Sequence, residues 1–81
     1  QNYPNPFNPV TVIAFSLPKD EMVKVIIYNI LGKEVKMLLN EELAAGTYSL
    51  TFSAEEFPSG VYFYRLSTPS VSMAKKMILE K

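Results

Sequence analysis

Short segments in which apolar and polar residues alternate, each bounded by glycine or proline, are the feature of this sequence that most constrains its fold. The boundaries fall at Pro18, Gly32, Gly46, Gly60 and Pro69, next to polar or small residues. The intervals between these boundaries are close to the spacing of about 8–12 residues between turns in all-β sandwiches and barrels. Alternation with a period of two indicates strands that bury one face. The sequence therefore predicts an all-β fold.

Two segments show the strand character most clearly. Residues 46–53 place Tyr48, Leu50 and Phe52 on one face and hydroxyl side chains on the other, as in a half-buried strand of an antiparallel sheet. Residues 60–67 are apolar on both faces, which indicates a central strand. The complete set of expected strands is 10–17, 23–29, 33–39, 46–53, 60–67 and 71–79.

Two segments are also compatible with helix. Residues 34–45 carry apolar side chains at helical spacing, but no good N-cap residue precedes them. We therefore favour a hairpin into a strand, followed by a loop. Residues 73–79 include Ala74, Met77 and Ile78 at i, i+3 and i+4, and here we also expect a strand.

The residue types that are missing exclude most chemistry. Without His or Cys, this chain of 81 residues has no imidazole base, thiolate nucleophile, disulfide or soft metal ligand. Its 8 Lys+Arg balance 8 Asp+Glu, so it lacks the broad basic field of a nucleic-acid-binding protein. No apolar run approaches the ~20 residues of a membrane span. We expect no enzymatic activity, no cofactor, no metal, no nucleic-acid partner and no direct membrane insertion.

Adjacent carboxylates occur at positions 20–21, 41–42 and 55–56, all in expected turns. Neighbouring side chains of an extended chain point to opposite faces, so these pairs do not suit general acid–base chemistry on one substrate. No spaced loop of oxygen ligands for a hard cation is present either. We expect all three pairs to be solvated charges.

A proline-rich arm, residues 1–9, precedes the first expected strand. Its three prolines fix φ and keep each preceding residue extended, so the arm holds Tyr3 and Phe7 at defined positions. One interpretation, which we favour, is that these rings close one end of a sandwich. The other is a preorganised docking segment. The expected organisation is an arm, 1–9, packed on a sandwich, 10–81.

Two further segments have a structural and a functional interpretation. The consecutive aromatics Tyr62, Phe63 and Tyr64 fit a core face and a contact face of one central strand better than a stacking platform for sugars or bases. Residues 74–81 mix charged and apolar side chains. They fit an edge strand protected by lysines, or an accessible C-terminal recognition tag.

These segments, in this order, resemble the type A C-terminal sorting domain of the type IX (Por) secretion system. The resemblance covers essentially the whole chain, and it is most specific in the opening motif and in residues 60–66. Phe52 stands where relatives often carry Trp. The short connection 53–59 favours this family over the related flagellar hook-capping domains. The residues that match family motifs are Asn5, Pro6, Phe7, Asn8, Pro9, Gly46, Tyr48, Gly60, Tyr62 and Leu66.

The resemblance implies an immunoglobulin-like antiparallel β-sandwich of six to seven strands at the C-terminus of a larger exported protein. Such a domain carries N-terminal cargo from the periplasm through an outer-membrane translocon to the cell surface or the medium. A sortase-like cysteine peptidase usually removes the domain at the surface, upstream of the opening motif. The implied function is that of a sorting signal without catalysis.

Lys75, Lys76, Met77 and Leu79 are the candidate residues for recognition by the translocon. An exposed terminal strand with alternating character suits strand addition, in which these side chains set the register. The alternative function is a fibronectin-like accessory or carbohydrate-binding module of a secreted glycosidase.

Overall fold

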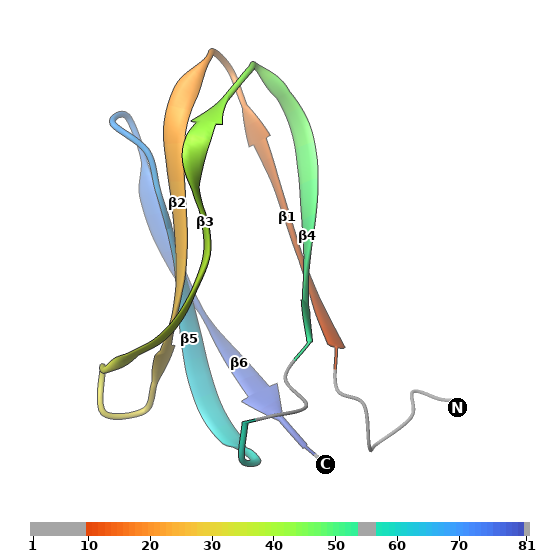
Figure 1. The fold of residues 1–81 in the computed structure, drawn as a ribbon, viewed down its shortest axis with the longest axis vertical. Helices are drawn as coiled ribbons and strands as arrows, with labels where there is room; N and C mark the ends of the chain where they lie inside the picture. Colours follow the sequence, from red (N-terminus) through yellow and green to blue (C-terminus); the bar gives the residue numbers. More distant parts are fainter. Residues whose placement is uncertain (1–9, 54–56, 81) are drawn as a thin grey trace.

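The computed structural model describes residues 10–53 and 57–80, and these residues form six strands and no helix. Figure 1 shows them as two layers. The predicted all-β fold is confirmed, and the arrangement is consistent with an immunoglobulin-like sandwich. The strands are β1 (Val10–Leu17), β2 (Glu21–Asn29), β3 (Glu34–Leu43), β4 (Gly46–Ser53), β5 (Gly60–Ser67) and β6 (Ser72–Leu79).

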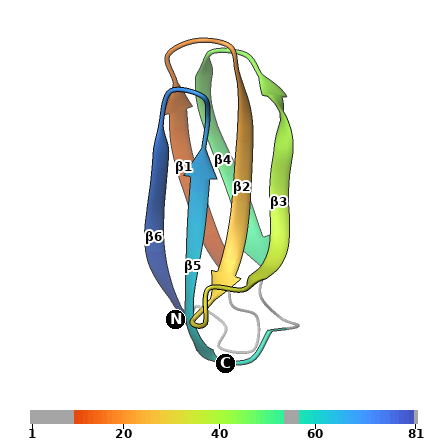
Figure 2. The same cartoon turned by 90° about the vertical axis from the view of Figure 1, so that its left-hand side faces the viewer.

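The two sheets differ in size. One contains β1 and β4, and the other has the order β3-β2-β5-β6, with every pair antiparallel. Figure 2 shows the four-stranded sheet in front of the two-stranded one. β5 lies between β2 and β6, which confirms the prediction of a central strand from its apolar residues on both faces. β3 and β6 are the edges of the larger sheet.

The predicted end of the third strand at residue 39 was wrong, as was the helical alternative for 34–45. β3 continues to Leu43, because β2 begins at Glu21 and gives residues 40–43 a partner strand. The pairing shifts register between Val25 and Ile26 and again between Ile27 and Tyr28. Two bulges therefore break the clean alternation of β3 that sequence analysis relies on.

The core lies between the sheets and is built from the alternating positions of their strands. Phe52, Ile13, Ile27, Val23 and Val25 are the largest fully buried side chains. Burial of each such side chain contributes about 1.5–3 kcal/mol. Other buried or half-buried side chains, among them Phe15, Leu17, Tyr48, Tyr62, Tyr64, Leu66, Met77 and Leu79, extend this core along the sandwich.

Glu21 is not the solvated turn charge that the sequence suggested. It starts β2 on the core-facing side and is only 5% exposed. The hydroxyl of Ser70 donates a 2.6 Å hydrogen bond to its Oε1. Asp20 is exposed and accepts a hydrogen bond from the Ala45 backbone NH. The pair at 41–42 is exposed, but it lies in β3 rather than in a turn.

The pair at 55–56 lies outside the described residues, and so does the predicted arm 1–9 with its motif residues Asn5, Pro6, Phe7, Asn8 and Pro9.

Candidate functional site

β6 contains all four residues proposed for recognition, but the structure divides them between different environments. Met77 and Leu79 are buried in the core, where they pair with Tyr62 and Gly60 of β5. Lys75 and Lys76 are exposed and point to opposite faces of the strand. The two apolar side chains hold β6 on the sheet, and the two lysines are accessible to a partner.

The outer edge of β6 has no partner strand among the described residues. β6 pairs only with β5 there, so no described strand uses the backbone groups of its opposite edge. Such an edge is a template for an additional strand, and lysines on it discourage unspecific pairing. The edge-strand interpretation is thus confirmed for residues 74–79, whereas the role of this segment in recognition stays a prediction.

The motif residues of the middle segments occupy two equivalent positions. Gly46 begins β4 and Gly60 begins β5, and each precedes by two residues a tyrosine, Tyr48 or Tyr62. A Cβ atom built on either glycine would lie 3.9 Å from the ring of that tyrosine. Leu66 is buried near the other end of β5. These residues support the fold of the domain rather than form an exposed site.

The turn between β2 and β3 presents two large apolar side chains to solvent. Asn29 organises it, because its Oδ1 accepts hydrogen bonds from the backbone NH groups of Leu31 and Lys33, at 2.9 and 3.0 Å. Gly32 follows with a φ of 83°, a conformation that favours glycine. Ile30 and Leu31 are 67% and 87% exposed at the tip.

The outer face of the four-stranded sheet carries an apolar surface that sequence reasoning only partly anticipated. Phe63 was expected to make a contact outside the core, and the structure places it opposite Tyr28 of β2 and Lys76 of β6. We call this surface the outer patch. It comprises Ile26, Tyr28, Met37, Phe63, Ala74 and Ile78.

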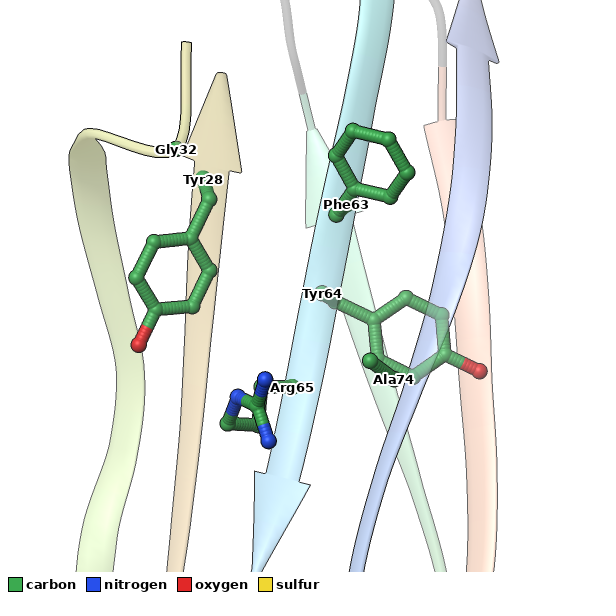
Figure 3. A pocket seen from close by; sticks show the side chains of 6 residues that line it. All are labelled: Tyr28, Gly32, Phe63, Tyr64, Arg65 and Ala74. Atoms are coloured by element: carbon green, nitrogen blue, oxygen red, sulfur yellow. The ribbon is translucent and has the colours of Figure 1, made fainter. Parts of the chain in front are cut away.

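A pocket of about 350 Å³ opens at this patch (Figure 3). Its lining residues come from β2, the β2–β3 turn, β5 and β6, which explains why no single sequence segment predicts it. In Figure 3, Tyr28 and Phe63 lie on either side of the hollow and Arg65 lies toward one end. The full lining is Tyr28, Gly32, Phe63, Tyr64, Arg65 and Ala74.

The described residues contain no group of three or more potential metal ligands. They also contain no helix long and apolar enough to cross a membrane. The described surface offers a strand edge, a hydrogen-bonded turn and an apolar patch, which are features that also occur at protein–protein contacts.

The comparisons with known proteins agree with that character. No curated protein and no solved structure matches this chain. The sequence model of one family, described as the secretion system C-terminal sorting domain, matches residues 1–80. Nothing in the comparisons supports the alternative of a glycosidase accessory module. The chain therefore belongs to the family of C-terminal sorting domains of the type IX secretion system, whose members are sorting signals and not catalysts.

Proposed function

We propose that the type IX secretion machinery recognises this sorting signal through the outer edge of β6. Family membership already implies a C-terminal sorting signal that directs the protein carrying it to the cell surface or the medium. The observation that supports the β6 edge as the contact surface is that the side chains of β6 divide into a buried pair and an exposed pair. Met77 and Leu79 anchor the strand in the core, while Lys75 and Lys76 stay exposed beside an edge without a described partner strand.

Strand addition explains why this arrangement suits recognition. A strand from the translocon that pairs with β6 gains main-chain hydrogen bonds that do not depend on the cargo. Lys75 and Lys76 lie on opposite faces of the extended strand, so carboxylates on both faces of an added strand can pair with them. A slip by one residue would exchange the two faces, and the lysines therefore set the register.

We further propose that the domain reaches the translocon from the periplasm, folded, and that a sortase-like cysteine peptidase then removes it upstream of residue 1. The domain itself performs no chemistry in this scheme. Mass spectrometry of the mature exported protein tests the removal. A mature protein that retains residues 1–81 would contradict it.

Deletion of the end of the chain is a poor test of the β6 edge, because it also removes Met77 and Leu79 from the core. A sharper experiment fuses residues 1–81 to a periplasmic reporter in a strain with a working type IX system. The test variant is Lys75→Glu/Lys76→Glu, and the matched control is Lys19→Glu/Lys33→Glu, which changes the charge equally at exposed lysines elsewhere.

We expect the charge reversal in β6 to lower export about tenfold, the effect of losing a contact worth 1.4 kcal/mol. The control should export like the wild type, and Lys75→Arg/Lys76→Arg should retain export because it keeps both charges. Equal export of the β6 reversal and the control would refute the assigned edge.

A further inference from the structure

We infer that the outer patch is a second docking surface of the sorting signal. Its occupant is a segment of a partner in the export machinery that places an aromatic or aliphatic side chain in the pocket and a carboxylate beside Arg65 and Lys76. This inference rests on the proposal that the machinery binds the folded domain. It concerns a surface that faces away from the core and does not require strand addition.

The composition of the outer patch is the first argument. A sheet face that meets only water is normally polar. The two-stranded sheet follows that rule on β4, although the neighbouring β1 exposes Val12 on the same face. Its outward residues on β4 are Thr47, Ser49 and Thr51. The outward face of the larger sheet instead carries the aromatic side chains of Phe63 and Tyr28.

Packing within the outer patch is the second argument. Ile26 points outward from β2 and is nevertheless only 8% exposed, so its neighbours on the face cover it. Met37 and Ile78 remain 44% and 63% exposed on the two flanking strands. The patch is thus an ordered apolar layer with side chains left uncovered at both sides. Aromatic residues, methionine and arginine are also the types enriched in protein interfaces.

The pocket gives this surface a defined shape. Tyr28 and Phe63 are direct neighbours on adjacent strands, while Gly32 and Ala74 contribute little or no side-chain volume. At about 350 Å³ the hollow has room for one large apolar side chain. Preformed walls lower the entropic cost of binding.

The charged side chains around the outer patch indicate which kind of partner segment binds there. Arg65 donates a 3.1 Å hydrogen bond to the hydroxyl of Ser72, and among the described residues no carboxylate forms an ion pair with Arg65 or with Lys76. Lys76 lies opposite Phe63, so Lys76 and Arg65 are the charged neighbours of Phe63. The exposed Glu34, in contrast, lies opposite Tyr28 on the β3 side of the patch. A guanidinium binds a carboxylate with two parallel hydrogen bonds, which favours an acidic occupant over a neutral or basic one.

The first test uses the isotope-labelled chain 1–81 and a small probe that carries both groups, N-acetyl-L-phenylalanine. Its addition should shift the amide NMR signals of Tyr28, Phe63, Arg65 and Ala74, with a Kd of about 1 mM. N-acetyl-L-phenylalanine amide, which lacks the carboxylate, should bind about tenfold more weakly. Arg65→Glu should abolish the difference between the two probes. Absence of shifts at these residues, or equal binding of both probes, overturns the inference.

The second test measures export of the reporter fusion with Phe63→Thr and with Arg65→Glu. The matched controls are Val12→Thr, an exposed apolar residue on the other sheet, and Lys19→Glu. Each variant is first compared with the wild type by thermal unfolding, so that export is judged only for folded domains. We expect the two patch variants to lose export about tenfold and the controls to keep it.

The outcomes separate this inference from the β6 edge. Normal export of folded Arg65→Glu together with loss in the β6 reversal overturns the outer patch and leaves the edge intact. Loss in the patch variants with normal export of the single variant Lys75→Glu, whose side chain lies on the face of β6 away from the outer patch, overturns the edge and leaves the patch intact. Sedimentation analysis tests a second copy of the domain as the occupant. If the wild-type domain is a dimer and the Phe63→Thr variant is a monomer, a second copy occupies the outer patch, and the inferred partner segment is refuted.

Discussion

The hydroxyl of Tyr62 donates a 2.8 Å hydrogen bond to the backbone carbonyl of Pro58, four residues earlier. The contact spans Gly60, so the start of β5 is tied to the connection that precedes it. Tyr48 makes the same contact with the carbonyl of Ala44, at 2.5 Å and across Gly46. The similar Gly-x-Tyr sequences at the starts of β4 and β5 are therefore two copies of one local device, related to the tyrosine corner of other sandwiches.

Replacement of Tyr62 by Phe should lower the free energy of unfolding by about 1 kcal/mol, the net value of one intramolecular hydrogen bond. The ring, which is largely buried, stays in place, so the apolar contacts persist. Urea unfolding of the isolated domain measures the change. Tyr28→Phe serves as the control, because its hydroxyl has no hydrogen bond among the described residues, and it should unfold like the wild type. Equal losses in both variants would contradict the prediction.

Gly32→Ala should destabilise the domain by about 1–2 kcal/mol, because the φ of 83° forces a Cβ atom into the left-handed region. Free space does not limit the substitution, since nothing lies within 4 Å of the added atom. Gly32→Asn should recover most of the loss, as asparagine tolerates this conformation. Thermal unfolding of the three proteins tests the ranking, and a Gly32→Ala variant as stable as the wild type would refute it.

Ser70→Ala should cost about 1.5–3 kcal/mol, the range for a hydrogen bond to a charged group. The substitution leaves the Oε1 atom of the buried Glu21 without the hydroxyl that contacts it. Ser49→Ala, an exposed serine on the outward face of β4, is the matched control and should change stability by less than about 0.5 kcal/mol. Denaturant titration of both variants decides whether this contact fixes the β5–β6 connection to the start of β2.

The strands were predictable from the sequence because their alternation is local information. Val10–Leu17, Gly46–Ser53 and Gly60–Ser67 have the predicted bounds. The continuation of β3 to Leu43 was not predictable, since it depends on pairing with residues about 20 positions away and on two bulges. Buried Glu21 escaped detection for a similar reason, because its hydrogen-bond partner Ser70 lies 49 residues later in the sequence.

Sequence analysis located the strand that we propose for recognition but not the accessibility of its side chains. Alternation predicts that Met77 and Leu79 share a face, yet only the pairing of β6 with β5 establishes that this face meets the core. The outer patch was less predictable still. Its centre joins Tyr28 and Phe63, which are adjacent only because β2 and β5 pair, although the apolar character of both faces of β5 was a visible signal.

Phe52→Ala should have the largest effect of any single substitution considered for this domain. Phe52 is among the largest fully buried side chains, and its ring lies 5.7 Å from that of Phe57, which connects the two-stranded sheet to the start of β5. Removal of a buried phenylalanine ring costs about 3–5 kcal/mol.

A small domain has only about 5–15 kcal/mol of total stability, so the Phe52→Ala variant should be close to unfolding at 37 °C. Leu50→Ala, on the same face of the same strand but half-buried, is the matched control and should cost clearly less. Circular dichroism during heating measures both. A smaller loss for Phe52→Ala than for Leu50→Ala would mean that the core is centred elsewhere along β4. Because export is proposed to require the folded domain, Phe52→Ala should also lower export of the reporter without altering any exposed residue.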